Sequence, residues 1–186
     1  MNSTKCFPLL LALCLIPAEL SAILMRPLPI AELSQKADLV VLGTVQSKSS
    51  HRDAEGRIYT KIELQVSETW KGTRSDASLT IYQGGGTVGN ERVEVSGEAE
   101  YGIGEEVVAF LVLNPRGQPI TLALAQGKFH VWKDKQTSEK FAHNVFHGSP
   151  ESARAAAKLA PGATAQKERE RLKLNDLGQK IKGVKP

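Results

Sequence analysis

The sequence predicts a mainly β protein: a small antiparallel barrel, preceded by a short helix and followed by a helical tail. Three observations support this. Residues 39–45 are a short apolar run, rich in β-branched side chains, without helical spacing. Residues 58–66 alternate apolar and polar side chains with period two. Residues 105–113 are almost all apolar, which indicates a strand buried on both faces.

The 39–45 segment is expected to be the strand around which the sheet is built. Gly43 interrupts it, and a glycine inside a strand marks a bulge or a sharp bend, as where one strand serves two sheets of a small closed barrel. The segment should pair antiparallel with 58–66. Just before it, the spacing of Ile30, Leu33 and Ala37 predicts one or two helical turns across a barrel mouth.

The remaining strands are shorter. A third strand is expected at 78–82 and a fourth at 91–96, with Val93 and Val95 pointing inward. A further strand over 120–133 should be broken by a bulge at Gln126-Gly127, and 141–146 can return as the second arm of a hairpin.

Residues 1–22 have the pattern of a secretory signal peptide. One basic residue precedes the apolar stretch, and a segment rich in small residues, Pro17 to Ala22, precedes the expected cleavage after Ala22. A lipoprotein cleavage at Cys14 is disfavoured, because the bulky Leu13 precedes it. If Cys6 and Cys14 leave with the signal, the secreted or periplasmic chain has no cysteine and therefore no disulfide. Nothing later in the chain has the length of an apolar transmembrane helix.

The chain divides into the signal, a barrel domain over 23–148 and a basic tail over 149–186. Leu172, Leu174 and Leu177 form only a thin apolar stripe in the tail, so we expect it to be helical or disordered and dispensable to the barrel. The net charge is only +4, which gives no support for specific nucleic-acid binding. We expect a monomer without a cofactor.

The histidines are the only candidates for a metal site. If the last hairpin closes around Gln136-Thr137, His130 lies opposite His143, and His147 lies further along the same face. Three converging imidazoles can hold zinc, so a small metal-dependent enzyme is one alternative. Surface histidines in a hydrated hairpin are the simpler interpretation. No Gly-x-Ser-x-Gly motif or paired carboxylates support catalysis, and the protein is expected not to be an enzyme.

A family resemblance appears when the segments are taken together. They are Ala37-Asp-Leu-Val-Val-Leu-Gly-Thr-Val45, Val66-Ser-Glu-Thr-Trp-Lys-Gly72, Gly84-Gly-Gly86, Tyr101-Gly-Ile-Gly-Glu-Glu-Val-Val-Ala-Phe-Leu111 and Gln126-Gly-Lys-Phe129. This pattern resembles uncharacterised bacterial secreted proteins with the OB-like barrel of netrin-type modules, the fold of tissue inhibitors of metalloproteases. The inhibitors chelate zinc with an amino-terminal cysteine, and that mechanism does not transfer to a chain beginning near Ile23.

The expected function is therefore a non-catalytic binding module for a protein or polymer partner. The alternative that the resemblance suggests is an inhibitor of an extracellular metalloprotease, which would insert 25–29 or the 83–90 loop into a cleft. The glycine run is not followed by Gly-Lys-Ser/Thr, so it predicts a loop and not a phosphate cradle. Trp70 is expected to cover a core end, with ligand stacking as its alternative. The candidate contact residues are Met25, Arg26, Trp70, Gly84, Gly85 and Gly86.

Overall fold

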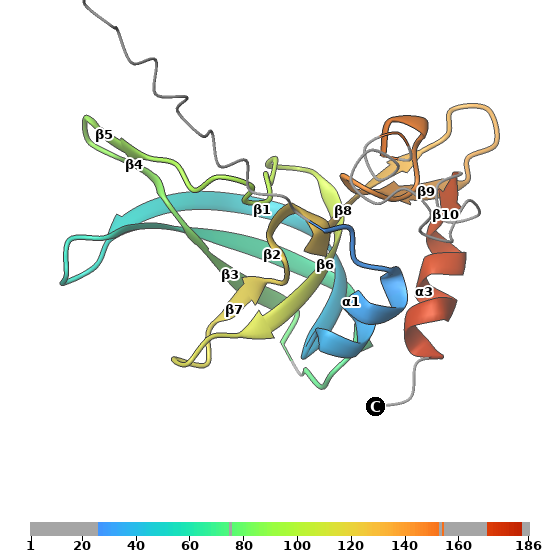
Figure 1. The fold of residues 1–186 in the computed structure, drawn as a ribbon, viewed down its shortest axis with the longest axis horizontal. Coiled ribbons are helices and arrows are strands. Elements are labelled where there is room, and N and C mark those ends of the chain that lie inside the picture. Colours follow the sequence, from blue (N-terminus) through green and yellow to red (C-terminus); the bar gives the residue numbers. More distant parts are fainter. Residues whose placement is uncertain (1–25, 75, 153, 155–170, 184–186) are drawn as a thin grey trace, which may run out of the picture.

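The computed structural model describes residues 26–74, 76–152, 154 and 171–183. Within these residues the strands form one eight-stranded antiparallel sheet and a separate two-stranded ribbon (Figure 1). The order across the sheet is β10-β9-β8-β6-β1-β2-β3, and β7 pairs with β6 beside β8. The predicted mainly β, antiparallel class is confirmed.

The described elements follow one another in this order: α1 (Ile30–Lys36), β1 (Leu39–Arg52), β2 (Ile58–Lys71), β3 (Ser78–Gly84), β4 (Gly86–Val88), β5 (Glu91–Val93), β6 (Glu106–Leu113), β7 (Pro119–Thr121), the 3-10 helix η1 (Leu124–Gly127), β8 (Lys128–Lys133), β9 (Lys140–His143), β10 (Leu172–Lys173) and α3 (Leu174–Lys182). The predicted signal peptide and Met25 lie outside the described residues, as does most of the tail up to residue 170. Among the described helices, none is both long and apolar enough to cross a membrane.

Strand β1 is the central strand, as its sequence predicts. It pairs antiparallel with β2 on one side and with β6 on the other. The register with β2 shifts at Gly43, where an added Cβ would lie 2.6 Å from the Gln65 carbonyl oxygen. The glycine is therefore required by the close approach of β2 at a bulge, which confirms the predicted role of Gly43.

Side chains of β1 and β6 alternate between two separate cores, because successive residues of a strand point to opposite faces. The helix-side core contains Ile30, Leu33, Ala37, Val40, Leu42, Trp70, Val108, Phe110, Phe129, Val131, Ala142, Leu172, Leu174, Leu177 and Ile181. The barrel-side core contains Leu39, Val41, Val45, Ile62, Leu64, Leu79, Ile81, Ala99, Tyr101, Val107, Ala109 and Leu111. The predicted burial of β6 on both faces is confirmed.

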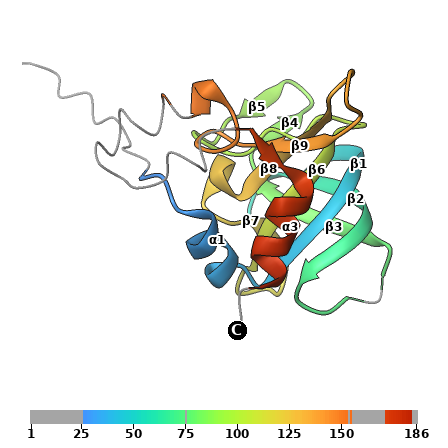
Figure 2. The same cartoon turned by 90° about the vertical axis from the view of Figure 1, so that its right-hand side faces the viewer.

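The carboxyl-terminal segment belongs to the fold, contrary to the expectation of a dispensable tail. Leu172 lies in β10, which pairs with β9. Leu177 and Ile181 of α3 are almost fully buried in the helix-side core. Helices α1 and α3 lie side by side over that core (Figure 2). The apolar stripe that looks thin in the sequence is sufficient because its partner surface is assembled from distant strands.

The sheet curls but is not shown to close. Strand β3 approaches β7, yet the strand pairings of the described residues include no ladder between the two. A closed barrel is therefore not shown, and the structure is an antiparallel sheet curled around the barrel-side core.

The structure differs from the predicted strands at 120–133 and 91–96. Strands β7 and β8 both pair with β6 and are separated by η1, so the break predicted at Gln126-Gly127 is present but longer than a single bulge.

The prediction of a strand at 91–96 with Val93 and Val95 pointing inward is wrong. Its first part, β5, pairs with β4 in the separate ribbon, and Val93 and Val95 are 38% and 43% exposed. A two-stranded ribbon has no second layer on which to bury them.

Candidate functional site

Trp70 is part of the helix-side core and not of an open surface. It is 7% exposed, and its indole N–H donates to the Glu68 carboxylate at 2.9 Å. The Cα of Gly178 in α3 packs against its ring, where an added Cβ would lie 3.3 Å away. The Lys182 ammonium lies 5.8 Å from the ring centroid. The alternative role of Trp70 in ligand stacking is therefore not supported, because α3 covers the ring.

The glycine run lies at the junction of β3 and β4, where its backbone is engaged by the protein. The Gly85 N–H donates to the Ile58 carbonyl at 3.0 Å, and the Gly85 carbonyl accepts from the Thr60 hydroxyl at 2.8 Å. At Gly86, with φ of +134°, an added Cβ would lie 2.4 Å from Ser50 Oγ. Gly84 donates its N–H to Glu98. The glycine run is therefore packed against neighbouring strands, and the N–H groups of Gly84 and Gly85 are already hydrogen-bonded within the protein.

The amino-terminal lead-in is hydrogen-bonded to η1. The buried Gln126 side chain accepts from the Leu28 N–H at 2.8 Å and donates to the Arg26 carbonyl at 3.1 Å. The Arg26 guanidinium pairs with Glu32 of α1 at 3.2 Å. Met25 lies outside the described residues. Arg26 to Leu28 thus run along the protein surface, which gives no support to insertion into a protease cleft.

His130 and His143 face each other, as the hairpin register predicts. They are direct cross-strand partners of β8 and β9, and their ring centroids are 5.2 Å apart. His147 does not join them. It is buried, bonds to Asn144 and packs on Phe129, whose side chain points to the opposite face of β8 from His130. Among the described residues, no group of three or more His, Cys, Asp or Glu side chains is arranged to hold a metal. The expected three-histidine convergence is wrong.

Glu105 is the charged centre beside this histidine pair. Its side chain is 14% exposed, and Oε1 lies 2.6 Å from His130 Nδ1. The same oxygen accepts from the Lys128 ammonium, while Oε2 accepts from the Gly102 N–H at 2.9 Å. Lys128 also donates to the Glu100 carbonyl at 2.6 Å. The carboxylate is thus held in place from three sides.

The environment shifts the acidity of this cluster. Burial acts to raise the pKa of Glu105, but the hydrogen bonds from Gly102, Lys128 and His130 outweigh it and lower that pKa. Burial also lowers the pKa of His143, with further lowering from the positive charges of His130 and Lys128. The electrostatics therefore favour an ionised Glu105 beside a neutral His143 at neutral pH.

Two further rings continue the same face of β8 and β9. Trp132 and Phe141 are stacked with centroids 5.1 Å apart, and the Arg171 guanidinium lies 5.6 Å and 5.7 Å from the two rings. Arg171 also bonds to Asp134. Because Arg171 covers these rings, they contribute to packing of the carboxyl-terminal segment.

A second row of rings lies on the outer face of β1, β2 and β3. His51 stacks on Tyr59 at 5.6 Å, and Tyr59 stacks on Tyr82 at 6.1 Å, both within the range favoured by aromatic pairs. The Lys61 ammonium lies 5.8 Å from the Tyr82 ring centroid. We call His51, Tyr59, Lys61 and Tyr82 the tyrosine row. Its rings are only partly buried, whereas Ile62 and Leu64 on the opposite face of β2 are fully buried.

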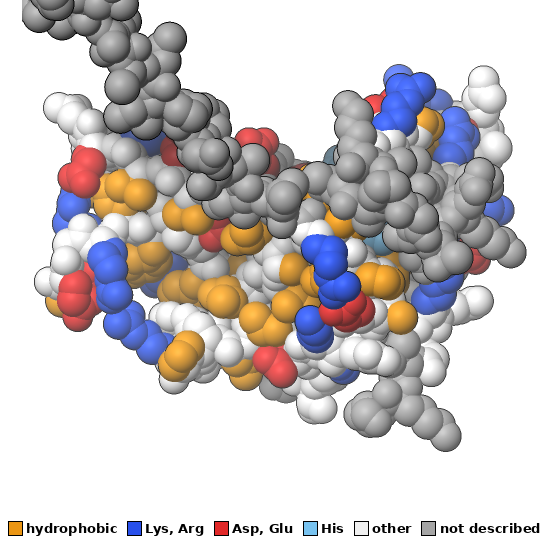
Figure 3. Space-filling model, viewed as in Figure 1, with side chains coloured by type: hydrophobic (Ala, Val, Ile, Leu, Met, Phe, Trp, Pro, Cys, Tyr) orange, Lys and Arg blue, Asp and Glu red, His pale blue; other side chains and the backbone are white. Residues whose placement is uncertain are grey.

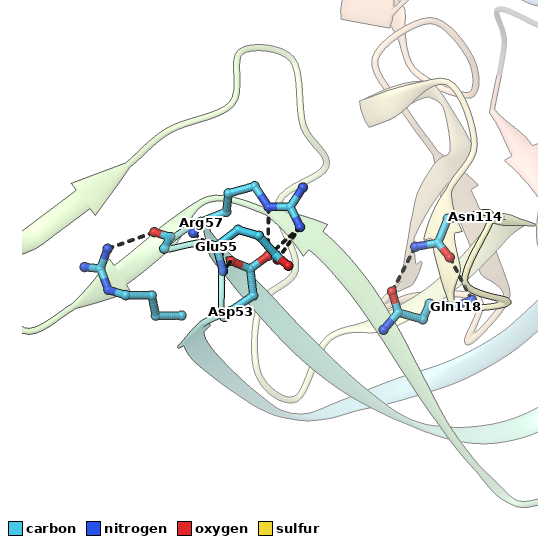
Figure 4. A network of polar contacts seen from close by, with 7 residues as sticks. Asp53, Glu55, Arg57, Asn114 and Gln118 are labelled. Atoms are coloured by element: carbon cyan, nitrogen blue, oxygen red, sulfur yellow. Dashed lines mark hydrogen bonds and ion pairs between the residues drawn. The ribbon is translucent and has the colours of Figure 1, made fainter.

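The β1–β2 turn beside the row is fixed by charged hydrogen bonds (Figure 4). Asp53 Oδ1 accepts from the Arg57 N–H at 2.8 Å, and Oδ2 accepts from Arg57 Nε at 2.8 Å. The Arg57 guanidinium also pairs with Glu55 at 2.8 Å, and Arg52 donates to the Gly56 carbonyl at 2.9 Å. This turn fixes the register of His51 against Tyr59.

The tyrosine row lies away from the helices. Helices α1 and α3 are gathered at one end of the molecule, whereas the β1–β2 hairpin extends toward the other (Figure 1). In the same view hydrophobic side chains are spread between the β4–β5 ribbon and β7 (Figure 3). The row itself places three partly exposed rings and the Lys61 side chain on paired strands.

Comparison with known proteins adds no family assignment. No model of a known protein family matches the chain, and no curated protein is significantly similar to it.

The tyrosine row was not predicted from the sequence, although part of it could have been. Tyr59 and Lys61 occupy the polar side of the period-two strand, a position from which side chains face solvent. Tyr82 reaches them only because β2 and β3 pair with Lys61 opposite Tyr82. That register is a property of the strand pair and cannot be predicted from either strand alone.

Proposed function

We propose that the protein is a non-catalytic binding module, secreted or periplasmic, that contacts a protein partner through the tyrosine row. The observation that carries this proposal is the continuous stack of His51, Tyr59 and Tyr82 on a partly exposed strand face. Tyrosine is enriched at protein interfaces because its ring buries a large area at a small entropic cost while its hydroxyl stays hydrogen-bonded. We also propose that the curled sheet has an OB-like fold.

The row has the properties of an interface centre. Its rings are fixed by cross-strand packing, so little side-chain entropy is lost on binding. Lys61 adds a cation beside Tyr82, which favours a partner with a carboxylate at that point. Secretion is supported by the pattern of residues 1–22, and the amino-terminal sequence of the exported protein tests it directly.

Site-specific photo-crosslinking in the producing cells tests the interface. A photoreactive residue placed at Tyr59 or at Tyr82 is expected to give one discrete adduct of the same mass increment with each. Arg92 on the β4–β5 ribbon is the matched control position, since its side chain is 72% exposed and it lies outside the row. Peptides of a second protein in the digested adduct identify a protein partner, whereas a mass increment that glycosidases remove identifies a polymer partner instead.

Variants then measure the energy of the contact with the partner so identified. Tyr59→Ala and Tyr82→Ala are each expected to weaken binding by at least about tenfold, as centrally placed interface aromatics do. Tyr59→Phe should bind nearly normally, because it keeps the ring. The proposal fails if neither position gives an adduct, or if Arg92 crosslinks as efficiently as Tyr59 and Tyr82.

A further inference from the structure

The histidine pair of β8 and β9 has unused ring nitrogens. In the described part of the chain, the hydrogen bond to His130 involves Nδ1 alone, and none involves a ring nitrogen of His143. Both residues lie at the end of the barrel-side face and are only partly buried.

The separation of the rings fits bidentate metal binding. A metal–nitrogen bond of about 2.1 Å puts the metal roughly 3.2 Å from each ring centroid. At a ligand–metal–ligand angle near that of a tetrahedron or a square plane, the two centroids are then about 4.5–5.2 Å apart. The observed separation between His130 and His143 is 5.2 Å. The rings meet edge to face at an interplanar angle of 67°, so metal binding requires them to rotate.

Glu105 is hydrogen-bonded to His130 in the way that a carboxylate is commonly hydrogen-bonded to a metal-binding histidine. A ligating imidazole commonly donates its other N–H to a carboxylate, which fixes its tautomer and makes it a better ligand. Glu105 Oε1 lies 2.6 Å from His130 Nδ1, so a proton on Nδ1 leaves the lone pair of Nε2 for a metal. Glu105 is itself fixed by the Gly102 N–H and Lys128. The Glu105 carboxylate thus orients the His130 ring through Nδ1 and leaves Nε2 for the metal.

Charges of both signs surround the pair. The positive charge of Lys128 acts on His143, and the negative charges of Glu105 and Glu151 act in the opposite sense. The ammonium of Lys128 is neutralised by Glu105, and that of Lys140 by Glu106 at 2.7 Å. Glu151 interacts electrostatically with His143 and adds a negative charge on its side of the pair.

We infer that His130 and His143 form a chelating pair for a divalent first-row transition ion, with Glu105 as the residue that positions His130. Imidazole nitrogens suit Cu²⁺, Ni²⁺ and Zn²⁺, and Cu²⁺ binds most tightly at a site of given donors. The remaining coordination positions are open to water or to a partner's group. This site is separate from the tyrosine row.

Titration of the untagged, metal-free protein with Cu²⁺, followed by calorimetry and electron paramagnetic resonance, tests the inference. One Cu²⁺ per chain is expected, with hyperfine splitting from two equatorial nitrogens. His130→Gln and His143→Gln should each remove that two-nitrogen signal. His51→Gln is the matched control, because His51 lies in the tyrosine row, and it should leave both stoichiometry and spectrum unchanged.

Glu105→Gln separates positioning from ligation. It is expected to weaken Cu²⁺ binding by about 10–100-fold while keeping the two-nitrogen spectrum, as loss of a carboxylate behind a ligand does. The thermal transition of each variant in the absence of metal verifies folding. Unchanged affinity in Glu105→Gln would overturn the positioning role. A two-nitrogen signal that persists in His130→Gln or His143→Gln, or the absence of stoichiometric binding in the unmodified protein, would overturn the site.

Discussion

At the scale of single residues, Gly43 is a position where the available space limits the side chain. It lies in the central strand, where an added Cβ would meet a backbone carbonyl at 2.6 Å and the Leu64 side chain at 3.1 Å. Backbone cannot move aside without disturbing the ladder between β1 and β2. Space at this position, not conformational freedom, is what excludes a larger residue.

Gly43→Ala should therefore lower the free energy of unfolding by about 1–3 kcal/mol, the usual cost of overpacking a core. Chemical denaturation measures it. Gly102→Ala is the matched control, because its Cβ would meet nothing closer than 3.6 Å, and it should change stability by less than about 0.5 kcal/mol. Equal effects of the two substitutions would contradict the bulge argument.

Glu98 provides a pH-dependent prediction. Burial raises its pKa, only partly offset by hydrogen bonds from the Gly84 and Ala99 N–H groups. The ionised carboxylate is then less favourable in the folded chain than in the unfolded chain. That cost is absent below the unfolded pKa, where both states are protonated. It develops as the pH rises to the folded pKa and is constant above it.

Glu98→Gln should consequently raise stability at pH 7 by a fraction of the about 1.4 kcal/mol that one pKa unit represents, since the group is partly solvated. The gain should vanish near pH 3. Denaturant melts of variant and unmodified protein at both pH values measure the difference, with the exposed Glu100→Gln as control. A gain that is the same at pH 3 and pH 7 would show that the charge is not its cause.

At the scale of elements, α3 is the one whose importance the sequence hides. The helix has nine residues, too few for stability in isolation, and depends on its docked face. Leu177 is fully buried in the helix-side core, and Gly178 allows the backbone to approach Trp70. The helix therefore packs against α1, β2 and β9.

Leu177→Ala should destabilise the protein by about 2–5 kcal/mol, because it leaves a cavity under the helix. Gln179→Ala, exposed on the same helix, should be nearly neutral. Thermal unfolding followed by circular dichroism compares the two variants. A neutral Leu177→Ala would restore the interpretation of this segment as a dispensable tail.

At the scale of the whole molecule, one sheet serves two cores. Val40 and Leu42 contribute to the helix-side core, whereas Leu39 and Val41 contribute to the barrel-side core. Strand β6 divides its side chains in the same way. The two cores should therefore unfold together, because neither can lose β1 without exposing the other.

Much of the sheet could be predicted from the sequence, because its strands and turns depend on residues close together in the chain. The apolar run with Gly43 predicted the central strand and its bulge, and the even spacing around Gln136-Thr137 predicted His130 opposite His143. The docking of α3 was not predicted, since its partner surface is built from strands distant in the chain. The tyrosine row was missed for a related reason, because it depends on the register between β2 and β3.

Native-state hydrogen exchange tests the central claim, that β1 is shared by both cores, most directly. The amides of residues 39–45 and 107–111 and those of α3 around Leu177 should exchange through one common opening whose free energy equals that of global unfolding. Exchange of α3 through a much lower-energy opening, with β1 still protected, would contradict the account, because the helix-side core would then be separable from the sheet.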